Sequence, residues 1–145
     1  MKSTRAVWIT WLQVVLGLLF CYALVLVFAG SVAGWLFSAL GFGPPPSVDS
    51  DGVRDYLKLP FMVLGAVMAG WALTMIQIVR GPLRDGSDGA RGDWARRVPV
   101  RSVALWFVLD TGMSVALGFP AHALFNVPFA LALGIPLWRL GAVSR

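Results

Sequence analysis

Long apolar runs separated by short polar stretches dominate the chain. The first run extends almost unbroken from residue 6 to residue 43, and three more follow after polar segments. A helix rises 1.5 Å per residue and the hydrocarbon core of a bilayer is about 30 Å thick, so about 20 apolar residues can cross it. We therefore predict four membrane-spanning helices, over residues 7–29, 60–79, 102–119 and 121–138.

The segments between these spans have the composition of connections. Residues 44–59 begin with three prolines and continue with charged residues, and residues 80–101 are basic and punctuated by glycine. The spans are rich in Ala, Leu and Gly without polar alternation, which favours helices over barrel strands. The predicted fold is an all-α integral membrane protein, one domain of residues 1–145 formed by a four-transmembrane-helix bundle.

Composition excludes the soluble classes. The chain is 58% hydrophobic and only 13% charged, with a mean hydropathy of +0.76, whereas soluble domains carry about 25% charged residues. Such an apolar chain is not a disordered one either. Cys21 has no second cysteine to pair with, and one His with one Cys makes no haem or zinc set. We expect no metal and no cofactor.

Basic residues are distributed unequally between the two predicted sides of the membrane. Ten of the 12 lie at the N-terminus, in residues 80–101 or at the C-terminus, and only Arg54 and Lys58 lie in the opposite linker. The positive-inside rule then places both termini and residues 80–101 in the cytoplasm, with residues 44–59 outside, as in a bacterial inner-membrane protein. Because the basic residues border apolar segments, we expect no nucleic-acid binding, and we expect the arginines of residues 80–101, with Trp94, to contact anionic lipid head groups.

The N-terminal run has a second interpretation. Ser31-Val32-Ala33 before Gly34 loosely matches a signal-peptide cleavage site. The apolar region is longer than the 7–15 residues of a signal peptide, so we expect an uncleaved span. Small residues four apart, Gly30 with Gly34 and Ala66 with Gly70, also indicate places where helices could approach closely.

Asp110 is the strongest chemical signal, because it falls near the middle of the third predicted span. A carboxylate at that depth costs about 2.5–3.5 kcal/mol on insertion scales, so it should face the bundle interior, a water-filled cavity or a partner. Trp106 and Ser114 share its helix face, four residues to either side, and Thr111 flanks it. Asp110 either carries a proton at a binding site or pins helix packing by a hydrogen bond.

The fourth predicted span offers partners for this acid. His122 and Asn126 are four residues apart and share a face. A hairpin folded at residues 119–120 would bring Ser114 level with Asn126, put Asp110 about 5 Å deeper, and leave His122 near the outer surface.

Two prolines in this span leave backbone carbonyls without their helical donor. Proline has no N–H, so Pro128 frees the carbonyl of Leu124 and Pro136 frees that of Ala132. Each carbonyl can then accept a hydrogen bond from another group.

Two aromatic residues of the other spans complete the candidate set. Counting along the helices puts Tyr22 near the depth of Asn126 and Trp71 near that of Asp110. Trp71 could form the aromatic wall of a pocket, or it could be ordinary core. The candidate site residues are Asp110, Asn126, Ser114, Thr111, His122, Trp71, Tyr22 and Trp106.

Three functions fit these residues, and binding is favoured over catalysis. The first is a small binding or transport protein in which protonation of Asp110 is linked to occupancy by a small lipophilic ligand. The second is a non-catalytic accessory or assembly subunit, in which Asp110 and Asn126 pair with a helix of another protein. The third is a lipid-modifying enzyme with Asp110 and His122 as acid and base. A chain of 145 residues encloses little volume, so we expect a homo-oligomer or a membrane partner protein.

Overall fold

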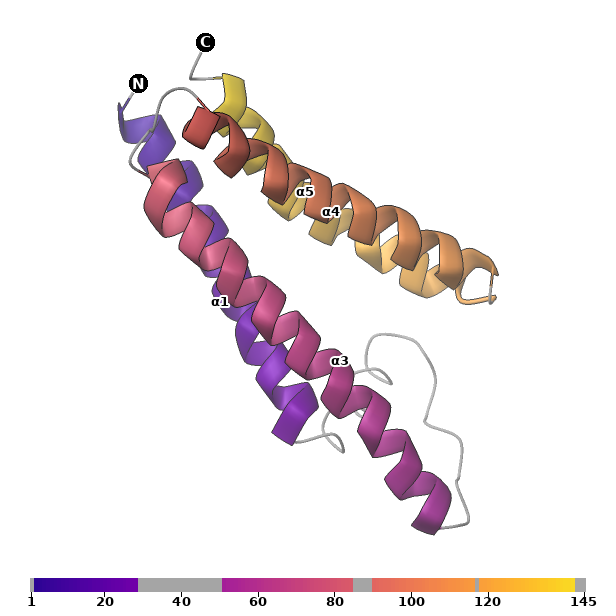
Figure 1. Cartoon of the computed structure of the whole chain (residues 1–145). Helices are drawn as coiled ribbons and strands as arrows, with labels where there is room; N and C mark the ends of the chain where they lie inside the picture. Colours follow the sequence, from indigo (N-terminus) through magenta and orange to yellow (C-terminus); the bar gives the residue numbers. More distant parts are fainter. Residues whose placement is uncertain (1, 29–50, 85–89, 117, 143–145) are drawn as a thin grey trace. The chain divides into compact units, whose positions relative to one another are not determined.

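The computed structural model of the chain describes residues 2–28, 51–84, 90–116 and 118–142. Within these residues it is helical, with α1 (Lys2–Phe28), α3 (Asp51–Ile78), the π-helix η2 (Val79–Leu83), α4 (Ala90–Ala116) and α5 (Pro120–Ala142) (Figure 1). Four stretches are long and apolar enough to cross a membrane: Thr4–Phe28, Pro60–Arg84, Gly92–Ala116 and Pro120–Leu140. The prediction of an all-helical chain with four such helices is confirmed.

Several predicted features lie outside the described residues. They are the Ser31-Val32-Ala33 cleavage motif, the Gly30 and Gly34 pair, and residues 44–50 of the predicted linker.

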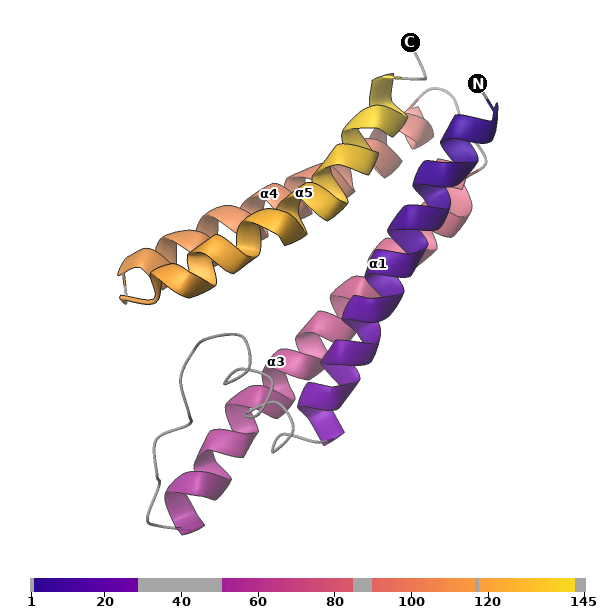
Figure 2. The same ribbon diagram turned by 180° about the vertical axis from the view of Figure 1, so that it is seen from behind.

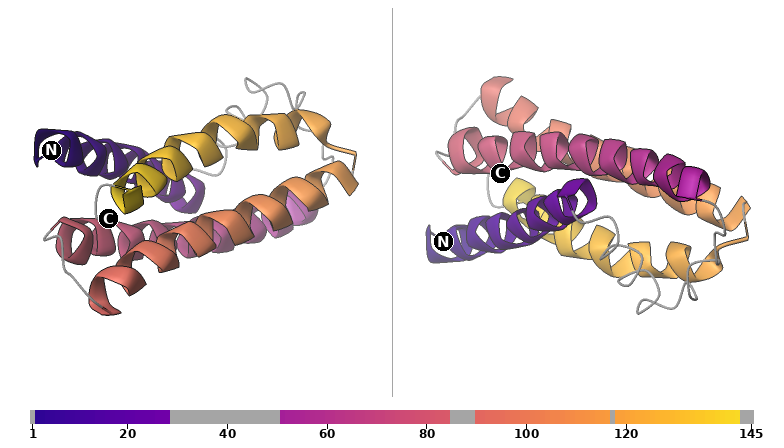
Figure 3. Two further views of the ribbon diagram at one scale, coloured as in Figure 1. Left: turned by 90° about the horizontal axis from the view of Figure 1, so that it is seen from above. Right: turned by 90° about the horizontal axis from the view of Figure 1, so that it is seen from below.

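The helices divide into two compact units, one comprising Met1–Leu16 with Thr74–Arg145 and the other Gly17–Leu73. In the first unit, α4 and α5 run side by side in opposite directions, as Figures 1, 2 and 3 all show. The polar cluster considered below lies in this hairpin. That the whole chain forms a single membrane domain stays a prediction.

A glycine sets the turn of the hairpin. Gly118 has φ +82°, the left-handed region that glycine enters readily. The N–H of Gly118 donates to the carbonyl of Val115 at 3.1 Å, and the N–H of Phe119 donates to that of Ser114 at 2.7 Å. These two bonds are those of a Schellman motif, which ends α4. Pro120 then starts α5 at the first helical position, where its missing N–H is harmless because that group would have no acceptor within the helix.

Two helices begin earlier than the apolar pattern predicts. α4 starts at Ala90 and not at 102, so much of the predicted basic loop is helical. Asp93, in its first turn, forms ion pairs with Arg96 and Arg97, and such i,i+3 and i,i+4 pairs favour helix. α3 starts at Asp51 and not at 60, with Pro60 inside it. Hydropathy marks where a helix becomes apolar and not where it begins.

The N-terminal half of α1 is held to the first unit by two side-chain donors. A guanidinium nitrogen of Arg5 donates to the carbonyl of Leu83 at 2.6 Å, at the end of η2. The indole N–H of Trp11 donates to the carbonyl of Ala132 at 2.9 Å. This is the carbonyl that Pro136 was predicted to free, so that prediction is confirmed with Trp11 as the donor.

The second unit contains a close approach of helix backbones. A Cβ placed on Gly65 of α3 would lie 2.6 Å from the carbonyl oxygen of Ala23 and 2.9 Å from the Cβ of Leu26, both in α1. Ala66 and Gly70, the pair predicted to allow such a contact, are exposed, so they do not make it with another described helix of this chain. One residue is a 100° rotation on a helix, and a small-residue spacing alone does not say which side meets a neighbour.

Candidate functional site

A polar cluster centred on Asp110 joins α4 to α5. The side-chain nitrogen of Asn126 donates to Asp110 Oδ2 at 2.7 Å, and His122 Nε2 lies 3.1 Å from the same oxygen. The nitrogen of Asn126 also donates to Thr111 Oγ1 at 3.2 Å. The hairpin thus brings together four of the eight residues singled out from sequence.

Asn126 is the buried centre of this cluster. Its relative exposure is only 2%, whereas the side chains of Asp110 and His122 are 37% and 28% exposed. An amide nitrogen has two N–H groups, and Asn126 directs them to oxygens of two adjacent α4 residues. Asn126 therefore sets the orientation of the Asp110 carboxylate, while Asp110 and His122 keep a partly open side.

The register of the hairpin differs from the predicted one. Asp110 lies level with Asn126, whereas the predicted fold put it about 5 Å deeper, and His122 reaches Asp110 instead of standing apart from it. The reason is the turn, which is centred on Gly118 and not on residues 119–120. The two helices of the hairpin run in opposite directions. Moving the centre of the turn by about two residues along the chain therefore shifts the residue of α5 that faces a given residue of α4 by about four positions.

Asp110 and His122 are an isolated ionisable pair. Between Arg101 and Arg139 the sequence contains no other side chain that ionises near neutral pH. The 3.1 Å contact suits a neutral imidazole that donates to the carboxylate, or an imidazolium that forms an ion pair with it.

The two carboxylate oxygens of Asp110 differ in their hydrogen bonds. Both contacts of its carboxylate use Oδ2, and within the described part of the chain Oδ1 accepts no hydrogen bond. A carboxylate oxygen can accept two hydrogen bonds. Oδ1 is therefore the acceptor that a ligand could use without displacing Asn126.

Ser114 and Trp106 flank the acid on α4 but serve different contacts. The hydroxyl of Ser114 donates to the backbone carbonyl of Asp110 at 2.6 Å, so its hydrogen is bound within its own helix. The ring of Trp106 meets that of Phe129 edge to face, with centroids 5.5 Å apart. Sequence reasoning missed Phe129, although it lies three residues after Asn126 and so shares its helix face.

Tyr22 and Trp71 lie in the unit Gly17–Leu73, and the polar cluster lies in the other. Both are partly buried on their helices. Their assignment to the Asp110 site therefore stays a prediction from sequence.

The part of the chain that the structure describes contains no group of three or more His, Cys, Asp or Glu side chains that could hold a metal ion. No protein-family model matches the chain, and neither does any curated protein or any solved structure.

Proposed function

We propose that this chain is a small integral membrane protein that binds, and by binding transports, a small lipophilic ligand in a proton-linked way at Asp110. The observation that carries the proposal is the contact of Asp110 with His122 and Asn126, the two ionisable side chains and the buried amide between Arg101 and Arg139 of the hairpin. Ionisable residues within membrane segments are rare and are commonly part of ligand or proton pathways.

Insertion into a membrane is supported by the surface of the helices. Large apolar side chains are exposed along all four, for example Leu18 at 66%, Val67 at 65%, Val108 at 65% and Leu124 at 73%. A soluble protein rarely exposes contiguous apolar area of this extent. In a bilayer the same side chains contact lipid.

A cytoplasmic position for both termini is supported by where the basic residues fall within the first unit. The Arg5 to Leu83 hydrogen bond joins the start of α1 to the end of η2. Arg96 and Arg97 lie in the N-terminal part of α4, and Arg139 lies in the last turn of α5, at the same end of the antiparallel hairpin. The cationic side chains therefore lie at one end of the unit, and the positive-inside rule assigns that end to the cytoplasmic side. We propose that the membrane is a bacterial inner membrane.

Proton linkage follows from competition for one carboxylate. A ligand that donates a hydrogen bond to Asp110 Oδ1 is favoured when Asp110 is ionised, because an ionised carboxylate is the stronger acceptor. A proton on Asp110 occupies the same acceptor. His122, 3.1 Å away, is the side chain that can take the proton as the ligand enters.

The experiment that tests this function is native mass spectrometry of the full-length protein released from its own membrane, wild type beside Asp110→Asn. Asn keeps the size of the side chain but can neither ionise nor carry the proton. We expect a homo-oligomer with a defined small mass bound to the wild type, and loss of that mass from the variant. Affinity for the isolated compound should then depend on pH in the wild type only.

Two results would contradict the proposal. If Asp110→Asn leaves ligand affinity and its pH dependence unchanged, Asp110 is not the site. A stable heteromeric complex that the variant breaks would instead make the chain an accessory subunit, in which Asp110 and Asn126 pair with a partner helix.

A second candidate function, a lipid-modifying enzyme, is favoured by the Asp110 to His122 contact. A carboxylate beside an imidazole orients the ring for acid and base chemistry, the roles that Asp110 and His122 would take. Turnover of labelled membrane lipid by the purified protein should then be lost in both Asp110→Ala and His122→Ala. Turnover that survives both substitutions would exclude this function.

A further inference from the structure

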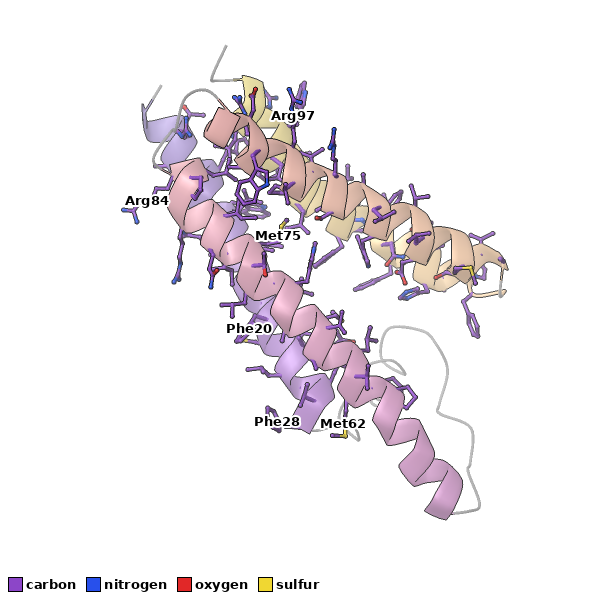
Figure 4. All side chains as sticks on the ribbon, in the orientation of Figure 1. Phe20, Phe28, Met62, Met75, Arg84 and Arg97 are labelled. Atoms are coloured by element: carbon purple, nitrogen blue, oxygen red, sulfur yellow. The ribbon has the colours of Figure 1, made fainter. Side chains whose placement is uncertain are left out.

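One face of α4 presents an exposed stripe that changes in character along its length. Trp94, Arg97, Arg101, Leu105 and Val108 follow each other at intervals of three and four residues, which puts them on one side of the helix. Trp94, Leu105 and Val108 are 52%, 62% and 65% exposed, the side chain of Arg97 is 67% exposed, and Arg101 is exposed too. Figure 4 shows Arg97 projecting from the N-terminal part of α4.

The opposite side of α4 is the packed one. Ala95, Pro99 and Val103 are buried there, and Asp110 continues the same side toward α5. The exposed stripe therefore points away from the helix contacts of α4. In a membrane protein this is the side that meets lipid.

The cationic part of the stripe begins where the apolar part ends. At 1.5 Å per residue, the apolar residues from Arg101 to the end of α4 at Ala116 measure only about 22 Å, less than the hydrocarbon thickness of about 30 Å. Arginine side chains can extend along apolar surface and hold their charge at the lipid head groups. Arg97 and Arg101, one turn apart, are placed to do so together.

Acidic neighbours leave these two cations available. Asp93 is hydrogen-bonded to Arg96, and its other oxygen lies 3.8 Å from Arg97, beyond hydrogen-bond distance. Arg97 is thus ion-paired with Asp93 without a hydrogen bond between them, and Arg101 has no acidic residue within one turn on either side in the sequence. A guanidinium pair is well matched to the oxygens of a phosphate.

We propose that Trp94, Arg97 and Arg101 form a binding site for the phosphate of an anionic phospholipid in the cytoplasmic leaflet. The two guanidinium groups donate to phosphate oxygens, and the indole of Trp94 lies at the head-group level that Trp prefers. The site rests on the membrane insertion proposed above but not on a ligand at Asp110.

The lipid would also set the depth of the polar cluster. Asp110 follows Arg101 by nine residues, which is about 13 Å along the helix and close to half the hydrocarbon thickness. Holding Arg101 at the phosphates therefore holds Asp110 near the centre of the bilayer. The lipid site and the Asp110 cluster are on opposite sides of α4, so each can be changed without touching the other.

The test compares two matched pairs of arginines in the full-length protein, reconstituted in nanodiscs of phosphatidylcholine with phosphatidylglycerol. The first variant is Arg97→Gln with Arg101→Gln. The control is Arg80→Gln with Arg84→Gln, which removes two exposed cations at the same spacing, but from a helix C-terminus, where an anion is disfavoured, and with no Trp beside them. Native mass spectrometry then measures the preference for phosphatidylglycerol over phosphatidylcholine.

We expect the first pair to lower this preference about 25-fold, or about fivefold per arginine, from about 1 kcal/mol per cation. The control pair should change it less than about twofold. Arg97→Lys with Arg101→Lys keeps the charge but loses the planar guanidinium groups, so it should retain only part of the preference, between the wild type and the Gln pair. Asp110→Asn should leave it unchanged.

Three results would overturn the proposal. Equal losses in the two Gln pairs would show that diffuse charge and not this stripe attracts lipid. A Lys pair that keeps the full preference of the wild type would show that charge alone, and not a guanidinium site, attracts the lipid. Displacement of phosphatidylglycerol by excess inorganic phosphate would make the ligand a soluble anion. A chain that does not enter nanodiscs at all would contradict the proposed membrane insertion itself. Failure of the lipid-binding prediction alone would leave the proposed ligand site at Asp110 to be tested separately.

Discussion

The pairing of α1 with α3 in the unit Gly17–Leu73 and the pairing of α4 with α5 in the other unit use different physics. In the first, Gly65 removes a side chain so that its backbone can approach Ala23 and Leu26. In the second, the amide of Asn126 and the carboxylate of Asp110 bridge the helices through side chains. Lipid is as apolar as a helix surface, so burial of apolar groups does not drive helices together in a membrane, and close packing or polar contacts must do it.

The difference between the two pairings indicates where function is to be sought. A glycine contact stabilises a helix pair and offers no group to a ligand. A polar contact of similar strength also holds a group that can exchange a proton or a hydrogen-bond partner. In the pairing of α4 with α5, Asp110 therefore both holds the two helices together and offers a group that can exchange a proton or a hydrogen-bond partner.

The largest expected effect is on the glycine contact. Gly65→Ala puts a methyl group 2.6 Å from the carbonyl oxygen of Ala23, a backbone atom that cannot simply rotate away. We expect a loss of about 1–3 kcal/mol, the range for overpacked cores, in thermal unfolding of the detergent-solubilised protein. Gly17→Ala is the control, because its added methyl meets nothing within 4 Å, and it should be neutral or stabilising. Equal losses in the two variants would mean that Gly65 is not a contact.

The next effect is on the polar contact. Asn126→Ala removes both donors of the buried amide, and we expect about 1–2 kcal/mol of destabilisation, since lost buried hydrogen-bond partners cost this much. A double-mutant cycle with Asp110→Ala should give a coupling of about 0.6–1.7 kcal/mol, the range for hydrogen bonds between membrane helices. A coupling of zero would show that the two side chains do not interact in the folded protein.

A smaller effect is expected where α1 meets α5. Trp11→Phe keeps an aromatic ring but removes the N–H that donates to Ala132, and we expect a loss of about 0.5–1.5 kcal/mol. Pro136→Ala supplies a backbone N–H that can satisfy the same carbonyl within the helix. The loss caused by Trp11→Phe should therefore shrink in the Pro136→Ala background, and an undiminished loss would assign it to packing of the indole.

The smallest effect is expected at the other acid of α4. Asp93 pairs with Arg96 and Arg97, but its side chain is 50% exposed, and exposed pairs of this spacing contribute about 0.3–0.5 kcal/mol. Asp93→Asn should change the unfolding midpoint little, and the small loss should fall further at high salt. A loss as large as that of Asn126→Ala would contradict the contrast drawn between the two polar regions.

Much of the hairpin could be anticipated from the sequence. The intervals of four between Asp110 and Ser114 and between His122 and Asn126 are enough to put each pair on one helix face. The freed carbonyl of Ala132 follows from the absence of an N–H in Pro136. Its partner Trp11 could not be foreseen, because the two residues are 121 positions apart and no local rule joins them.

The errors have a common origin. The predicted register failed because a proline was taken as the centre of the turn, whereas the left-handed Gly118 is its centre and Pro120 begins the next helix. The predicted contact at Ala66 and Gly70 is not made with another described helix of the chain, because the spacing of small residues does not say which way that side of the helix faces. Both errors concern how one helix is placed against another.

The sequence by itself determined that the chain forms four long apolar helices and that only Asp110 and His122 can ionise between Arg101 and Arg139. Hydropathy is a sum over one segment, so it needs no knowledge of neighbours. Only the tertiary structure decided that Asp110 meets both Asn126 and His122, and that Gly65 is the glycine at a helix contact. These pairings depend on the backbone angles of one turn and on the rotation of each helix about its axis, which packing between helices sets.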